Sequence, residues 1–128
     1  MKSPERWRIG VGSIEQPKAS TALHNMTIKL HNRILMTGAA GNLGQALRER
    51  LKANCNVLRL SDRADFGAAR EHEEVVLADL ADGAAVQDMM RDVDAVVHFG
   101  GISTEAPFEP ILQANIIGAY NLYEAARK

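Results

Sequence analysis

The stretch Ile34–Leu51, ILMTGAAGNLGQALRERL, contains the clearest structural signal in the chain. It opens with a short apolar run that ends at Gly38, which is typical of a strand buried on both faces of a sheet. After the glycine-rich turn, leucines recur every four residues with charged residues on the other faces, which predicts a helix with one buried stripe. We therefore expect a strand over about 33–37 and a helix over about 42–53.

The glycines of this turn have the spacing GxxGxxG, and each has a predicted task. Gly38 permits a tight exit from the strand, Gly41 lets the backbone approach a pyrophosphate, and Gly44 lets the helix pack against the sheet. The free N–H groups that open the helix favour a phosphate. Because the turn joins a strand to a helix, it predicts a dinucleotide site with contacts from Gly38, Ala40, Gly41, Asn42, Leu43 and Gly44.

The rest of the chain continues the alternation of strand and helix. Further strands are expected at Val57–Leu60 with a polar end at Ser61 and Asp62, at Glu74–Ala78 and at Ala95–Phe99. Asp82 is expected to cap a helix, and a last helix follows Pro107 and Pro110. This order predicts an α/β fold: a Rossmann-like doubly wound parallel sheet, incomplete, with about four strands and lacking strand five onward.

A carboxylate at the end of the second strand indicates which dinucleotide is bound. Asp62 lies 18 residues past Gly44, near the spacing of about 20 at which an acid accepts hydrogen bonds from the adenosine ribose. A carboxylate there repels a 2′-phosphate, which predicts NAD rather than NADP. Arg63 could pair with such a phosphate, and a plain turn or cap role for Asp62 is the structural alternative.

Residues 1–32 differ in composition from the domain that we expect over 33–128. They mix Pro, Gly, Ser and charges of both signs without a sustained period, which predicts a disordered extension. Met26 is the start that we expect if the upstream residues do not belong to the natural chain. A transit peptide is the alternative, and Glu5 and Glu15 count against it.

Composition narrows the range of partners. With 15 basic and 16 acidic residues the net charge is −1, so we expect neither nucleic-acid binding nor binding to an anionic membrane. The apolar runs are too short to span a bilayer or to direct secretion, which favours a cytoplasmic protein. Cys55 is the single cysteine and the four histidines are scattered, so no disulfide or metal site is expected.

The chain resembles the extended short-chain dehydrogenase/reductase superfamily, which includes the NAD-dependent epimerases and dehydratases. The matching runs cover nearly everything from Arg33 onward: LMTGAAGNLGQALRERL, VLRLSD, ADLAD, VVHFGGIS and ILQANIIGAYNLYEAARK. TGAAGNLG is specific only to the superfamily. FGGIS and NIIGAYNLYEAAR are narrower, and with them the chain is most similar to the uronate dehydrogenases.

This resemblance implies oxidation of hexuronates, such as glucuronate and galacturonate, at C1 to aldarolactones with NAD. It implies further cofactor contacts at Asp79, Leu80, Gly100 and Gly101. It also implies substrate contacts at Ser103 and Asn115. The structural alternatives are a strand-end acid for Asp79, a turn residue for Ser103 and a buried amide bonded to backbone for Asn115. We interpret His98 as a satisfied core histidine, and a homo-oligomer is compatible with a full-length enzyme.

The chain departs from the superfamily at the catalytic pair. The chemistry needs a tyrosine as general base and a lysine four residues on whose charge lowers the tyrosine pKa. The residues four beyond Tyr120 and Tyr123 are Glu124 and Arg127, so we reject both tyrosines and expect no catalytic residue here. We therefore expect the N-terminal, NAD-binding part of a uronate dehydrogenase. A free-standing NAD-binding regulatory module and part of a nucleotide-sugar epimerase or dehydratase remain alternatives.

Overall fold

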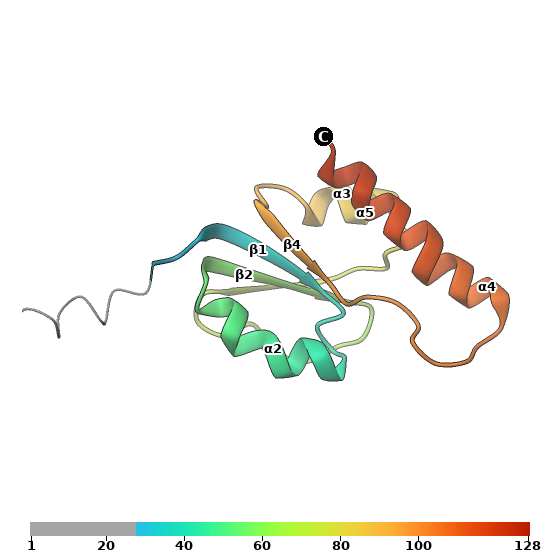
Figure 1. The fold of residues 1–128 in the computed structure, drawn as a ribbon, viewed down its shortest axis with the longest axis horizontal. Coiled ribbons are helices and arrows are strands. Elements are labelled where there is room, and N and C mark those ends of the chain that lie inside the picture. The colour runs from blue at the N-terminus through green and yellow to red at the C-terminus, as the bar shows by residue number, and fades with distance from the viewer. Residues whose placement is uncertain (1–27) are drawn as a thin grey trace, which may run out of the picture.

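The computed structural model describes residues 28–128, in which helices cover both faces of one sheet (Figure 1). The elements follow in the order β1 (His31–Thr37), α2 (Asn42–Lys52), β2 (Cys55–Asp62), β3 (Glu73–Leu77), α3 (Gly83–Met89), β4 (Ala95–His98), α4 (Phe108–Ile111), η1 (Leu112–Ile117) and α5 (Gly118–Ala126). Most of the predicted extension, Met26 included, lies outside the described residues.

The sheet has the strand order β3-β2-β1-β4, and all of its pairings are parallel. The predicted Rossmann-like sheet of four parallel strands is therefore confirmed. The reversal of strand order lies between β1 and β4, since the chain first builds outward from β1 to β3 and then returns to pair β4 with β1. In open sheets of this type, ligands bind at such a point, beyond the carboxyl ends of the strands.

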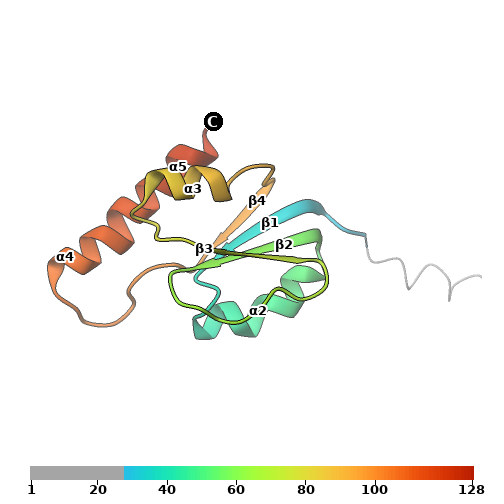
Figure 2. The same ribbon diagram turned by 180° about the vertical axis from the view of Figure 1, so that it is seen from behind.

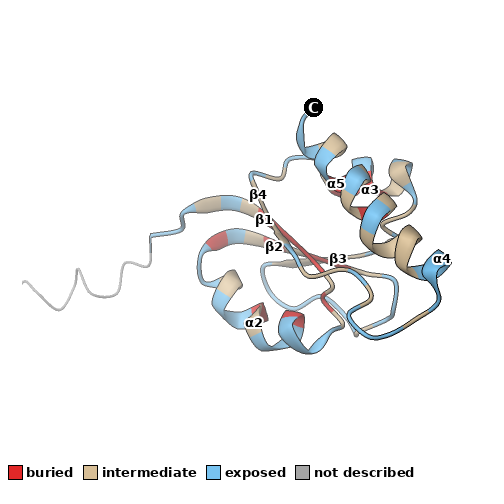
Figure 3. Cartoon of the chain, turned by 45° about the vertical axis from the view of Figure 1, so that its right-hand side comes forward, coloured by how far each residue is buried: buried red, intermediate tan, exposed pale blue. Residues whose placement is uncertain are grey.

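The strands are apolar because both of their faces are covered. Helix α2 lies on one face, and α3 lies with the rod of α4, η1 and α5 on the other (Figures 1 and 2). Ile34 and Met36 pack in a cluster with β2, while Leu35 between them packs in a second cluster on the opposite face. Buried residues gather on the central strands and on the helix sides that face them (Figure 3).

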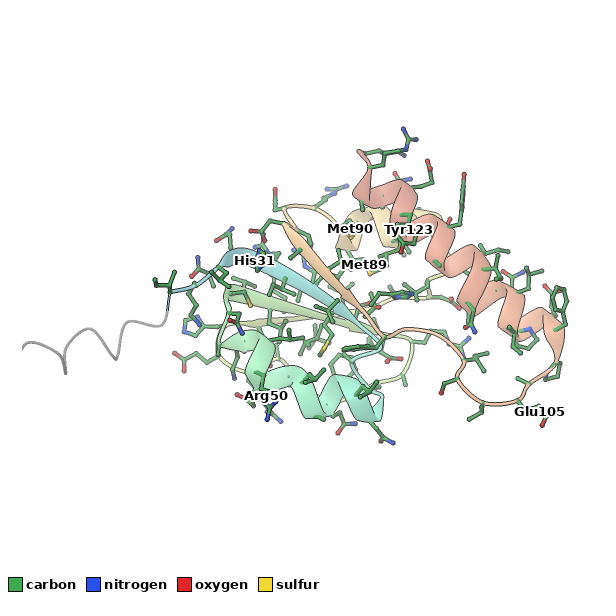
Figure 4. The ribbon with its side chains drawn as sticks, in the orientation of Figure 1. His31, Arg50, Met89, Met90, Glu105 and Tyr123 are labelled. Carbon is green, nitrogen blue, oxygen red and sulfur yellow. The ribbon has the colours of Figure 1, made fainter. Side chains whose placement is uncertain are left out.

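The second cluster fixes the helices that reach the site. Its buried members are Leu35, Val86, Met89 and Leu122, which come from β1, α3 and α5. Met89 lies between α3 and the sheet, whereas Arg50 points away from the sheet on the opposite layer (Figure 4). Asp82 caps α3 as predicted, because its carboxylate accepts hydrogen bonds from the N–H groups of Ala84 and Ala85.

One buried ion pair ties α2 to the edge strand β3. Arg48 Nη2 lies 2.5 Å from Glu73 Oε2, and Arg48 Nε donates to Glu73 Oε1 at 2.9 Å. Solvent reaches 9% of the Arg48 side chain and none of the Glu73 side chain. Hydrogen bonding to Arg48 holds the pKa of the Glu73 carboxyl at about 2, below its ordinary value of 4.5.

The last helix differs from its prediction in its internal geometry. An apolar period near 3.6 predicted one regular helix, but residues 112–117 form a π-helical stretch between α4 and α5. A π stretch makes i→i+5 hydrogen bonds and often marks a functional site. Within residues 28–128, no helix combines the length and the apolar character that crossing a membrane requires.

Candidate functional site

A cavity of about 730 Å³ opens at the carboxyl ends of the strands. This volume is in the range of small-molecule and cofactor sites, about 300–1,000 Å³. The cavity is lined by every site residue predicted from the sequence except Ala40, namely Gly38, Gly41, Asn42, Leu43, Gly44, Asp62, Asp79, Leu80, Gly100, Gly101, Ser103 and Asn115. The fold thus brings together residues from the ends of all four strands and from the last helix.

Two positions of the glycine turn, Gly38 and Gly44, have no room for a side chain. For Gly44 the reason differs from the predicted one. Gly38 has φ +73°, and a Cβ on it would lie 2.5 Å from the backbone carbon of Phe99. A Cβ on Gly44 would collide with the carbonyl oxygen of Gly38 and lie 2.8 Å from Ala39 Cα. Gly44 therefore lets α2 close against the turn itself, where we predicted contact with the sheet.

Within residues 28–128, no hydrogen-bond partner is seen for the backbone N–H groups that open α2, whose residues line the cavity. Gly41 is the N-cap, no side chain caps the helix, and its first turn contains no acidic residue. The first intrahelical bond runs from Gln45 N to Gly41 O, so the N–H groups of Asn42 and Leu43 precede it. A Cβ on Gly41 would have only Gly38 O within 4 Å, at 3.3 Å, so this glycine borders open space. These features suit an anion such as a pyrophosphate.

Asp62 joins the glycine turn to β2. Its Oδ2 accepts a hydrogen bond from Ala40 N at 3.0 Å, and its Oδ1 accepts one from Ala64 N at 3.1 Å. The turn role that we held as an alternative therefore exists, and the same carboxylate also lines the cavity. Each carboxylate oxygen can accept more than one hydrogen bond, so a ribose hydroxyl can still be bound.

The turn after β3 forms the next part of the wall. Asp79 Oδ1 accepts a hydrogen bond from Ala81 N at 2.9 Å, and Arg63 Nη1 lies 3.7 Å from Asp79 Oδ2. The Leu80 side chain covers Gly100, where an added Cβ would lie 2.6 Å from Leu80 Cδ1. A side chain at position 100 would therefore have to displace Leu80.

His98 is not a core residue, so our interpretation of it is wrong. It is the last residue of β4, and its exposed side chain lines the cavity at the carboxyl edge of the sheet. Its Nδ1 lies 2.6 Å from Thr37 Oγ1, which also accepts a hydrogen bond from Gly100 N at 3.2 Å. Partial burial lowers the pKa of His98 and favours the neutral ring. The following Gly100-Gly101 pair was the sequence signal that the strand ends here.

Asn115, in η1, holds the loop after β4 in the way that its structural alternative described. Its Oδ1 accepts from Ile102 N at 2.7 Å and its Nδ2 donates to Ile102 O at 2.9 Å. Gly101 has φ +149°, and a Cβ on it would lie 2.8 Å from Asn115 Oδ1. The exposed Ser103 follows at the cavity wall.

Tyr123 of α5 also lines the cavity, with its side chain largely exposed (Figure 4). Arg127 Nη2 is hydrogen-bonded to Glu124 at 2.8 Å, so it is engaged on the helix surface. Among residues 28–128, no three His, Cys, Asp or Glu side chains are grouped to hold a metal ion. The arrangement can hold phosphates and a ribose, and it offers no tyrosine–lysine pair for proton transfer.

Comparison with known proteins identifies a family for this arrangement. The profile of the NAD dependent epimerase/dehydratase family matches residues 34–128. Uronate dehydrogenase from Pseudomonas putida is 58% identical over 104 residues, which are 80% of this chain and 39% of that enzyme. Uronate dehydrogenase from Agrobacterium fabrum is 57% identical over 95 residues, 74% of this chain and 36% of that enzyme. The chain thus spans less than two-fifths of these relatives.

Solved structures agree with the sequence comparison. The crystal structure of uronate dehydrogenase from Agrobacterium tumefaciens superposes with a TM-score of 0.75 at 55% identity, over 77% of this chain and 37% of that one. A variant of that enzyme in complex with NAD superposes with a TM-score of 0.74 at 56% identity, over 76% and 37% of the two chains.

Proposed function

Because the chain belongs to the NAD-dependent epimerase/dehydratase family, we propose that its cavity holds NAD and that the chain is the cofactor-binding part of a uronate dehydrogenase. The observation that carries this proposal is the open start of α2 beside Gly41. Backbone N–H groups at this helix start belong to residues that line the cavity, and Gly41 leaves the space beside them open. Asp62, which also lines the cavity, follows the glycine turn at the sequence spacing of a ribose-binding carboxylate. The residues therefore fit a dinucleotide pyrophosphate and its adenosine ribose.

Each wall of the cavity has a part in this proposal. Gly38 through Gly44 hold the pyrophosphate, and Asp62 accepts the adenosine ribose hydroxyls. Asp79 and Leu80 contact the adenine, and Gly100 and Gly101 let the dinucleotide pass close to the backbone after β4. When bound, NAD accepts a hydride from the sugar; the chain contributes binding and orientation rather than a proton acceptor, since no tyrosine in it has a lysine four residues on.

The similarity to uronate dehydrogenases at 55–58% identity supports the substrate class that we propose. We assign hexuronates, glucuronate and galacturonate, oxidised at C1 to aldarolactones. Ser103 and Asn115 would border the sugar from this part of the protein, and they come from the loop after β4 and from η1. Similarity to a dTDP-glucose 4,6-dehydratase from Mycolicibacterium smegmatis is lower, at 33% identity.

A chimera tests the assignment. Residues 33–128 would replace the matching part of the Agrobacterium uronate dehydrogenase, which supplies the remainder of the enzyme. We expect NADH formation from glucuronate and galacturonate, no turnover of dTDP-glucose, and no turnover by the 128-residue chain alone. A folded chimera that binds NADH but oxidises neither uronate would refute the substrate class, while leaving the NAD site standing.

A free-standing NAD-binding module is the second candidate function. It is favoured by the absence of a Tyr-x-x-x-Lys motif from the 128 residues. The two candidates share the NAD site and differ in what the chimera does. Uronate turnover supports the enzyme part, whereas tight NAD binding by the chain alone together with an inactive chimera supports the module.

A further inference from the structure

The turn that follows β3 is held from outside by the last helix. Asn121 of α5 is partly buried, and its Nδ2 donates hydrogen bonds to Leu80 O at 2.9 Å and to Ala81 O at 3.2 Å. Within residues 28–128, no other side chain donates to these two carbonyl oxygens. The turn also bonds internally, from Asp82 N to Asp79 O, and to the end of β2, where Ala78 N donates to Asp62 O and Arg63 pairs with Asp79.

The backbone of α5 also approaches this turn closely. A Cβ on Gly118 would lie 2.7 Å from Leu80 Cβ, so only a glycine lets the helix reach the turn at this point. Leu80 in turn reaches across the cavity wall to Gly100. The position of α5 is thereby transmitted through Leu80 to two walls of the cavity.

We propose that Asn121 is a positioning residue for the adenine end of the dinucleotide. Asn121 does not itself line the cavity, and it acts through the backbone carbonyls of Leu80 and Ala81. By fixing these carbonyl groups, Asn121 positions the adjoining Asp79 carboxylate. In the proposed site this carboxylate accepts a hydrogen bond from the adenine amino group. This inference rests on the proposed NAD site.

The rod formed by η1 and α5 is hydrogen-bonded to two loops that line the cavity. Asn115 in η1 makes a paired amide contact with Ile102 after β4, and Asn121 makes its double contact with the turn after β3. The two asparagines lie on one continuous rod, and each bonds a different loop that lines the cavity. Asn121 therefore affects base recognition, whereas Asn115 affects the wall near the proposed sugar site.

The test compares two dinucleotides that differ only at the base. NAD carries adenine with a 6-amino donor, and nicotinamide hypoxanthine dinucleotide carries a 6-carbonyl acceptor that Asp79 cannot bond. Affinities for the 128-residue chain are measured by calorimetry for the parent, Asn121→Asp and Asn121→Ala. Asn56→Asp is the matched control, since it makes the same change at an exposed position far along β2 from the cavity.

We expect the parent to prefer NAD and Asn121→Asp to reduce that preference about tenfold, because a carboxylate would face two carbonyl oxygens and displace the turn. Asn121→Ala should reduce it in the same direction, and Asn56→Asp should leave it unchanged. Equal weakening of both dinucleotides, or an unchanged ratio, would overturn the positioning role. A parent that binds both equally would overturn it as well. A folded parent that binds neither would contradict the proposed function itself, and the inference with it.

Discussion

At the scale of single residues, Asp62 combines a structural and a binding role. Its carboxylate accepts N–H bonds from Ala40 and Ala64, and it lines the cavity. Its position along the chain could be predicted from the spacing, because that spacing reflects the length of one βαβ unit. The bond to Ala40 could not, since it joins residues 22 apart through the closing of the turn.

Asp62→Ala should weaken NADH binding and narrow the preference for NADH over NADPH by about tenfold, because it removes both a ribose acceptor and a charge that repels the 2′-phosphate. Fluorescence titration with each nucleotide measures this. Asp65→Ala is the control, because Asp65 makes a similar turn bond to Gly67 N away from the cavity. A parent chain that binds NADPH as tightly as NADH would show that Asp62 does not select the cofactor.

The buried pair of Arg48 and Glu73 predicts a pH-dependent stability. Glu73→Gln leaves the Arg48 charge without its partner and should reduce the free energy of unfolding by about 3 kcal/mol at pH 7. The pKa of Glu73 is lowered to about 2, so its contribution is present above its unfolded pKa near 4.5 and is lost as the pH falls toward 2. The difference between parent and variant should therefore shrink below pH 4.5.

Urea unfolding at pH 7, 4 and 3 measures this difference. Asp88→Asn is the control, because Asp88 pairs with Arg91 at the surface and such pairs contribute about 0–1 kcal/mol. If Glu73→Gln were no more destabilising than Asp88→Asn, the pair would not hold α2 to β3.

At the scale of elements, local sequence patterns predicted the strands and the helix cap, which depend on local residue preferences. The apolar runs gave the four strands to within two residues, and Asp82 was recognised as the cap of α3. The π stretch η1 and the exposed end of β4 at His98 were missed. Both depend on packing between distant segments: Asn115 on the loop at Ile102, and His98 on Thr37. Hydrophobic periodicity indicates which face of an element is buried, but it does not indicate contacts between distant segments.

Two glycines of one turn should respond differently to alanine. A Cβ on Gly41 has only Gly38 O nearby, at 3.3 Å, so Gly41→Ala should change the melting temperature little and weaken NADH at least tenfold by filling the space of the pyrophosphate. A Cβ on Gly44 meets the turn backbone, so Gly44→Ala should lower the melting temperature as well. Calorimetric melting and NADH titration separate the effects. Unimpaired NADH binding by a folded Gly41→Ala chain would mean that the pyrophosphate lies elsewhere.

At the scale of the whole molecule, the fold gathers one cavity from four strand ends and one helix. The glycine turn and Asp62 could be predicted from motif and spacing, and the other predicted cavity residues, Asp79 and Gly100 among them, from the resemblance; parallel strands then place their carboxyl ends at one edge. Substrate recognition could be predicted only from the resemblance. The resemblance assigns Ser103 and Asn115 of this chain to the sugar. Both the oxygen and the nitrogen of the Asn115 amide are hydrogen-bonded to the Ile102 backbone.

Whether this chain builds an NAD site is measured by equilibrium titration of the purified 128-residue chain with NADH. We expect saturable binding of one NADH per chain, displaced by NAD and weakened at least tenfold in Gly41→Ala with little change in melting temperature. A chain that melts cooperatively, and is therefore folded, yet shows no saturable NADH binding would contradict it.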